Sequence, residues 1–194
     1  MTKRLFSALL SLVLFCGVCR GTDENAYVET WLQYVPSLGA VGLGLAGVKA
    51  ENPFASRCVE LGLAAVAEIA LVNGILKPLV NEERPDGSAF NSFPSGHTAT
   101  AFAGAELMRL EYGWGWGGAA YALSAGVGAL RVYHQRHWWW DTVAGAGAGI
   151  LSANVGRQLL NPTLRLFGLE AKAAFSPVVC PSEGVYCATL SLSF

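Results

Sequence analysis

Three short clusters place basic, acidic and histidine residues against an otherwise apolar chain. The first, KPLVNEERP, begins at Lys77 and contains Arg84. The second, PSGH, occupies residues 94–97, and the third, RVYHQRHWWWD, occupies residues 131–141. The third cluster also holds two of the three histidines of the chain. Such a concentration of uncommon polar residues indicates a site for chemistry.

Several of these residues are suited to binding a phosphate group. Lys77, Arg84 and Arg131 supply three cations, and a guanidinium group offers a planar fork of donors that matches phosphate oxygens. Ser95 and Gly96 open an expected helix, where free backbone N–H groups and the helix dipole favour an anion. Glycine also lets a ligand approach the backbone closely. We therefore expect these five residues to bind phosphate.

The remaining polar residues of the clusters are candidates for catalysis. His137 and Asp141 are four residues apart, which would place them on one face of a helix. The carboxylate would accept the proton of one imidazole nitrogen and leave the other as an unprotonated nucleophile. His97 is then the candidate acid for the leaving oxygen. His134 lacks a carboxylate four residues further on, and we expect it to be structural or at the rim of the site.

Together the clusters resemble the motifs of the type 2 phosphatidic-acid phosphatase (PAP2) superfamily, written K-x6-R-P, P-S-G-H and S-R-x5-H-x3-D. The spacings and the order match, with Leu130 where the family has serine. The wider resemblance covers roughly residues 65–160 and is greatest to exported bacterial members that act on lipid A or other lipid phosphates. It implies an all-α fold, a compact and membrane-associated helical bundle of the PAP2 type.

The resemblance also implies a metal-independent phosphoric monoester hydrolase without a cofactor. His137 would form a phosphohistidine, and His97 would protonate the leaving alkoxide and then activate water. The same residues leave other substrates open, namely an isoprenyl diphosphate or a soluble phosphomonoester. A vanadium haloperoxidase has a similar site but is generally a much larger protein. A non-enzymatic envelope scaffold is a further alternative, against which the intact motif residues argue.

Composition favours a membrane over a nucleic acid as partner. Hydrophobic residues make up 53% of the 194 residues and charged residues 14%, against about 25% charged in soluble domains. The mean hydropathy is +0.39 and the net charge is −1, without a basic stripe. We expect a membrane-associated protein with a lipid phosphate as substrate and no nucleic-acid partner.

The apolar segments between the clusters predict the elements that position them. Helical patterns cover 57–80 and 97–111, and uncharged stretches rich in glycine and alanine cover 112–130 and 142–156. Small residues at 145–149 would let helix backbones approach closely. We expect Pro162 to end the last helix. Glu68 and Glu106 are expected to satisfy buried partners or face solvent, and Arg109 and Glu111 to form a solvated helix end.

The two ends of the chain differ from its centre. Residues 1–21 read as a signal peptide or N-terminal anchor, which implies export to the periplasmic side of a bacterial membrane. Residues 22–175 would form the phosphatase domain and 176–194 an extended tail with a β-hairpin-like segment. In an oxidising compartment Cys180 and Cys187 could form a disulfide. For the tryptophans at 138–140, an acyl-chain entrance, a membrane anchor and plain packing all remain open.

Overall fold

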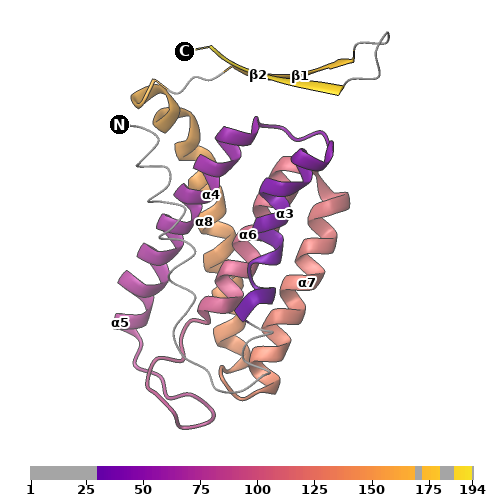
Figure 1. Ribbon diagram of the computed structural model, residues 1–194. Coiled ribbons are helices and arrows are strands. Elements are labelled where there is room, and N and C mark those ends of the chain that lie inside the picture. The colour runs from indigo at the N-terminus through magenta and orange to yellow at the C-terminus, as the bar shows by residue number, and fades with distance from the viewer. Residues whose placement is uncertain (1–29, 169–171, 180–185, 194) are drawn as a thin grey trace.

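A bundle of long helices makes up most of the computed structural model, which describes residues 30–168, 172–179 and 186–193 (Figure 1). The expected all-α fold is confirmed. In chain order the elements are α3 (Val35–Gly42), η1 (Leu43–Ala46), α4 (Phe54–Ile69), η2 (Ala70–Leu76), α5 (Lys77–Leu79), α6 (Gly96–Tyr112), α7 (Trp114–Tyr133), α8 (Trp139–Leu166), β1 (Lys172–Val179) and β2 (Tyr186–Ser193).

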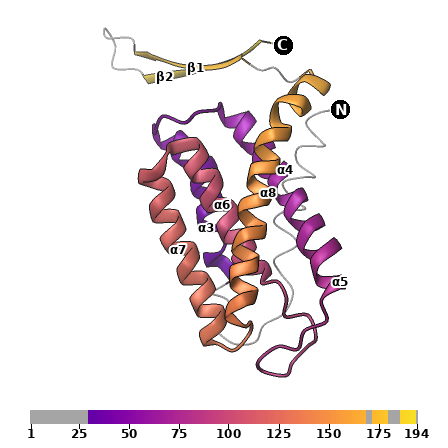
Figure 2. The same ribbon diagram turned by 180° about the vertical axis from the view of Figure 1, so that it is seen from behind.

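Helix α6 lies at the centre of the bundle. It packs against α3, α7 and α8, and α4 packs against α8 on the other side (Figures 1 and 2). The core between these helices is made mostly of small side chains, so the helix axes can approach closely. Its buried members are Ala40, Ala64, Ala103, Ala105, Leu107, Met108, Ala120 and Ala153.

Two glycines of α8 show how close this approach is. A Cβ atom at Gly145 would overlap the carbonyl oxygen of Ser95, and one at Gly149 would overlap that of Ala99. No side chain other than hydrogen fits at these two positions without a shift of backbone. The expectation that small residues around 145–149 permit close packing is confirmed. As a result, the first turns of α6 and α8 lie directly against each other.

Elements α4, η2 and α5 run on from one another as a single helical stretch, Phe54–Leu79, which confirms the helix expected at 57–80. Within the described residues, it is the helix that is long and apolar enough to cross a membrane, with a mean hydropathy of 1.8. Several of its large apolar side chains are exposed: Phe54, Val66, Ile69, Ile75 and Leu79. Its η2 section is a π-helix that ends immediately before Lys77, and such sections are frequent at functional sites.

Helix α8 does not end at Pro162, so that expectation is wrong. The helix continues to Leu166, with Pro162 inside its last turns. A proline ring holds φ near the helical value, but it removes one N–H group and crowds the carbonyl four residues earlier. The helix continues for four more residues past this position, so here the loss of one hydrogen bond and the contact of the ring with the preceding turn do not stop it.

The C-terminal strands β1 and β2 pair antiparallel, from Lys172 opposite Ser193 to Val179 opposite Tyr186. This is the hairpin expected near the end of the chain, and the domain boundary expected at residue 175 falls inside β1. Residues 1–21 and Cys180 lie outside the described residues. The signal peptide or anchor and the Cys180–Cys187 disulfide therefore stay predictions.

Candidate active site

All three motifs lie at one end of the bundle. The end of α5, the start of α6, the end of α7 and the start of α8 meet there, together with the loop of residues 80–95 (Figures 1 and 2). Lys77 begins α5, and Arg84 lies in that loop. Ser95 is the N-cap of α6, and Arg131 lies in the last turn of α7.

His137 lies in the turn between α7 and α8 rather than inside a helix. The turn is made by Gln135 in the left-handed region, with φ of 54°, and by His137 N–H donating to the Arg131 carbonyl at 3.3 Å. The His137 side chain is 2% exposed, and its Nδ1 lies 2.7 Å from the carbonyl oxygen of Ser92. Because a carbonyl only accepts, Nδ1 carries the proton and Nε2 keeps its lone pair.

Asp141 is close to His137 for a different reason from the one expected. Helix α8 begins at Trp139, so the two residues do not share a helical face. The nearest Asp141 oxygen, Oδ2, is 3.7 Å from His137 Nδ1, which is too long for a hydrogen bond. Oδ2 instead accepts from the N–H of Trp138 at 2.9 Å and from the hydroxyl of Ser92. The expected direct hydrogen bond from the imidazole to Asp141 is absent in this structure.

Backbone groups join the second motif to the third. Ser95 N–H donates to the Asp141 carbonyl at 3.0 Å. That N–H group is therefore used within the protein, contrary to the expectation that it would bind phosphate. Gly96, the first residue of α6, remains suited to the expected role. A Cβ atom at Gly96 would meet nothing within 4 Å, so there is open space beside this helix N-terminus. His97 follows as the second residue of α6.

The three expected cations act on the imidazole of His137. Burial has the largest effect on its pKa, and Arg131 and Arg84 follow; together with Lys77 they lower the pKa of His137 from 6.5 to about 3. The hydrogen bond to Ser92 acts in the opposite direction and is outweighed. His137 is therefore neutral near pH 7, with cationic charge gathered around it.

The three cationic side chains differ in their burial and in their hydrogen-bond partners. Lys77 Nζ donates to the carbonyl of Asn91 at 3.0 Å, which leaves two of its protons for other acceptors. Arg131 is 7% exposed. The Nε of Arg84 is buried and has no hydrogen-bond partner among the described residues. A buried guanidinium N–H without an acceptor is costly, and the oxygen of a bound anion would satisfy it.

Tryptophans after His137 hold the loop that carries Arg84. Trp138 Nε1 donates to the Glu83 carbonyl at 3.0 Å, and Trp140 Nε1 donates to Glu82 Oε1 at 2.8 Å. The two indole rings stack with centroids 5.1 Å apart. These contacts favour packing as one role of the tryptophans. The sequence analysis did not identify the role of Ser92 or the contacts of Trp138 and Trp140 with the loop. Neither a single serine nor a run of tryptophans indicates which distant residue it contacts.

Other polar residues serve the bundle itself. Glu106 accepts from Arg109, Tyr121 and Asn154, and Glu68 accepts from Thr100 at 2.7 Å, so the expected buried partners are confirmed. The expectation of a solvated helix end at Glu111 is wrong. Glu111 is 5% exposed because Arg157 and Asn52 donate to its Oε1 at 2.9 and 2.7 Å.

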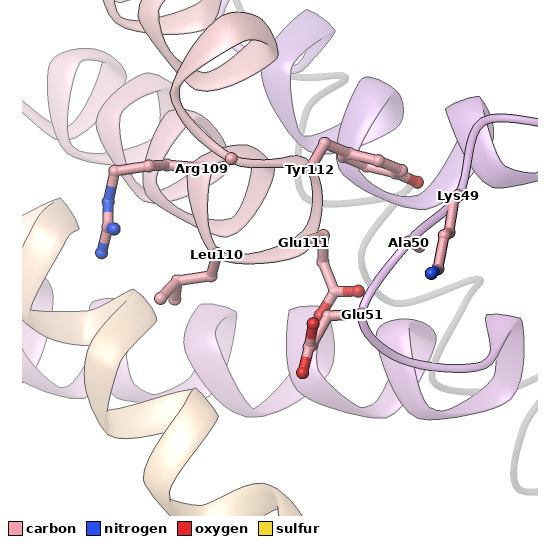
Figure 3. Close-up of a pocket in the computed structure, with 8 residues that line it drawn as sticks. Lys49, Ala50, Glu51, Arg109, Leu110, Glu111 and Tyr112 are labelled. Carbon is pink, nitrogen blue, oxygen red and sulfur yellow. The ribbon is translucent and has the colours of Figure 1, made fainter.

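A pocket of about 320 Å³ lies at the far end of α6 from the motifs. Figure 3 shows Glu111 and Tyr112 on the side facing the loop of Lys49 and Glu51, while Arg109 extends away. None of the motif residues lines it, so we do not identify it with the candidate site. Among the described residues, no three His, Cys, Asp or Glu side chains are grouped to hold a metal ion. The pocket at the far end of α6 is lined by Lys49, Ala50, Glu51, Arg109, Leu110, Glu111, Tyr112 and Gly113.

Fold and site define a helical protein in which three cationic side chains surround a buried, neutral histidine, and the comparisons identify its family. Residues 58–164 match the PAP2 superfamily. The chain belongs to this superfamily, which confirms the resemblance seen in its motifs. A 77-residue stretch is 49% identical to a protein of Porphyromonas gingivalis named lipid A 1-phosphatase. That stretch covers 38% of this chain but only 17% of the relative.

The fold is also similar to a solved structure, the crystal structure of Aquifex aeolicus LpxE. The TM-score is 0.52 at 24% sequence identity, over 77% of this chain and 94% of that one. At this level of sequence identity, the similarity supports a shared fold and nothing more specific. The helical bundle is therefore one that a known protein also adopts.

Proposed function

We propose that this chain is a phosphatase that removes a phosphate monoester from a lipid through a phosphohistidine on His137. The observation that carries the proposal is the state of that side chain. The imidazole is buried and neutral, and its Nδ1 proton is held by a backbone carbonyl. A neutral imidazole with a free Nε2 lone pair is a nucleophile, and the surrounding cations favour an anionic substrate.

In the first proposed step, Nε2 of His137 attacks phosphorus in line with the leaving oxygen. The new P–N bond forms as the P–O bond breaks, and His97 gives its proton to the departing alkoxide. Lys77, Arg84 and Arg131 stabilise the charge on the equatorial oxygens, assisted by the N–H of Gly96. These fixed cations take the part that Mg²⁺ has in kinases.

In the second step, the now neutral His97 takes a proton from water, whose oxygen attacks phosphorus. The P–N bond breaks, and its electron pair returns to Nε2 of His137. Inorganic phosphate leaves, and both histidines are in their starting states. His97 thus acts first as acid and then as base at one position, the start of α6.

A lipid substrate at a membrane is supported by the surface around the site. Tyr133 and Trp139 are 80% and 63% exposed beside His137, and such aromatic residues are enriched at membrane interfaces. The apolar helical stretch Phe54–Leu79, several of whose large side chains are exposed, contains Lys77 near its end. The relative named lipid A 1-phosphatase supports a lipid A phosphate as one candidate. With the expected signal peptide, this favours the periplasmic side of a membrane.

The test is phosphate release by the purified full chain in detergent micelles. The substrates are lipid A, phosphatidic acid, phosphatidylglycerol phosphate and undecaprenyl diphosphate, with p-nitrophenyl phosphate as a soluble ester. We expect release from at least one lipid monoester, at a rate well above the soluble ester and lost in His137→Ala. Equal rates on the soluble ester would overturn the lipid assignment. Absence of release from every substrate would overturn the enzyme assignment.

A further inference from the structure

One buried serine outside the three motifs contacts both the candidate nucleophile and its carboxylate. Ser92 has no exposed surface, and its three polar groups are all used. Its carbonyl accepts from His137 Nδ1 at 2.7 Å, and its hydroxyl donates to Asp141 Oδ2. Its N–H donates to the Glu82 carbonyl at 3.0 Å. Ser92 therefore stands between Asp141 and His137 in a chain of hydrogen bonds.

The distances show that the hydrogen-bonded connection from Asp141 to the imidazole passes through Ser92. His137 Nδ1 lies 2.7 Å from the Ser92 carbonyl but 3.7 Å from the nearest carboxylate oxygen. Only the shorter distance is a hydrogen bond. The carboxylate is also held in place on its other side by Trp138 N–H at 2.9 Å. A rigid carboxylate that fixes the serine hydroxyl also fixes the direction of the serine carbonyl.

We propose that Ser92 is a positioning residue through which Asp141 fixes the orientation and the tautomer of the His137 imidazole. Its hydroxyl is locked by the carboxylate, and its carbonyl keeps the proton of His137 on Nδ1. A backbone carbonyl only accepts hydrogen bonds, so it favours the tautomer of the neutral imidazole that has its proton on Nδ1 and a free Nε2. The kinetic consequence of this inference rests on the proposed phosphatase function.

The substitution Ser92→Ala removes the hydroxyl and keeps the carbonyl. The residue then keeps its N–H bond to the Glu82 carbonyl and its carbonyl beside His137 Nδ1, but it loses the bond to Asp141 that holds it in place, so the carbonyl can turn away from the imidazole more easily. Hydrogen bonds to charged groups of this kind correspond to losses of about 10- to 100-fold. We expect kcat to fall by that factor with KM within about twofold, because Ser92 does not touch the substrate.

The matched control is Ser152→Ala. Ser152 is equally buried and lies on α8 with Asp141, but its hydroxyl donates to the Ala148 carbonyl one turn earlier at 2.8 Å. We expect kcat within about twofold of the wild type for this control. Rates are normalised to the amount of folded protein, so that partial unfolding does not count as a catalytic loss. An equal loss in both variants would overturn the proposal.

A second measurement does not require turnover. In ¹⁵N-histidine NMR spectra, assigned by the loss of signals in His137→Ala, the wild type should show the Nδ1–H tautomer. Ser92→Ala and Asp141→Ala should each show a mixture of tautomers. The fraction of the Nε2–H tautomer in the double variant should be no larger than in either single variant. The Nε2–H tautomer in the wild type would overturn the proposal, as would an unchanged tautomer in either single variant. If no substrate is hydrolysed, the proposed function fails, while these spectra still decide the role of Ser92.

Discussion

His137 should stay neutral at acidic pH values where an ordinary histidine takes up a proton. Burial, then Arg131 and Arg84, lower its pKa from 6.5 to about 3. A difference of about 3.5 in pKa corresponds to about 5 kcal/mol between the two protonation states. At pH 5 an ordinary histidine would be about 3% neutral, whereas His137 would be about 99% neutral. The nucleophilic form would thus be about 30 times more abundant.

The assay is a ¹⁵N-histidine NMR titration from about pH 8 to about pH 2. Arg84→Gln removes one cation and should raise the pKa of His137. The control is Arg136→Gln. Arg136 is adjacent to His137 in sequence, but it pairs with Asp86 at 3.2 Å and is not one of the main causes of the lowered pKa. A wild-type midpoint above about pH 5 would refute the reasoning. So would a shift in Arg136→Gln as large as that in Arg84→Gln.

The same pKa makes folding stability depend on pH. Because the pKa of His137 is lower in the folded protein than in the unfolded chain, the unfolded chain binds more protons between about pH 3 and 6.5. The contribution of this group to the free energy of unfolding should therefore decrease as the pH falls below about 6.5. Denaturant midpoints at pH 7 and pH 4 should differ less in His137→Gln than in the wild type.

The remaining predictions concern the reaction and the helix packing. His137→Ala should lose on the order of 10⁴-fold or more in activity, while His134→Ala should stay within about tenfold; acid-labile ³²P trapped on the His134 side of a proteolytic map would contradict this. Phosphate release should survive excess EDTA, because fixed cations stabilise the phosphoryl group, and loss with recovery on Mg²⁺ would show otherwise. Orthovanadate should inhibit much more strongly than free phosphate, as a mimic of the transition state; equal inhibition would count against in-line attack. Gly149→Ala should lower the unfolding free energy by about 1–3 kcal/mol, whereas Gly147→Ala, which meets open space, should be neutral or stabilising; similar denaturation midpoints would contradict the close packing.

Features that depend on neighbouring residues were predictable from the sequence. The helix at 57–80 and the helix after Ser95 follow from apolar periodicity and from a helix start at PSGH. The gathering of Lys77, Arg84 and Arg131 around His137 follows from the motif resemblance, and their effect on its pKa agrees with it. In each case the information lies in residue types and short spacings.

Features that depend on distant partners were not predictable. The solvated end expected at Glu111 is buried, because Asn52 and Arg157, which are 59 and 46 residues away, both donate to it. The spacing of His137 and Asp141 indicated a shared helical face, yet α8 begins between them. A four-residue spacing has this meaning only inside a helix.

The sequence by itself determined which chemical groups the protein has, their order along the chain and the superfamily to which it belongs. Tertiary structure alone decided which acceptor holds the His137 proton and how far its pKa falls. Both depend on distances between groups that are far apart in the chain, since Ser92 and His137 are separated by 45 residues. The close approach that Gly145 permits brings the start of α8 against the start of α6, where Ser95 N–H donates to the Asp141 carbonyl. Hydrogen bonding, burial and Coulomb interactions all vary steeply with such distances, and no local pattern of residues encodes them.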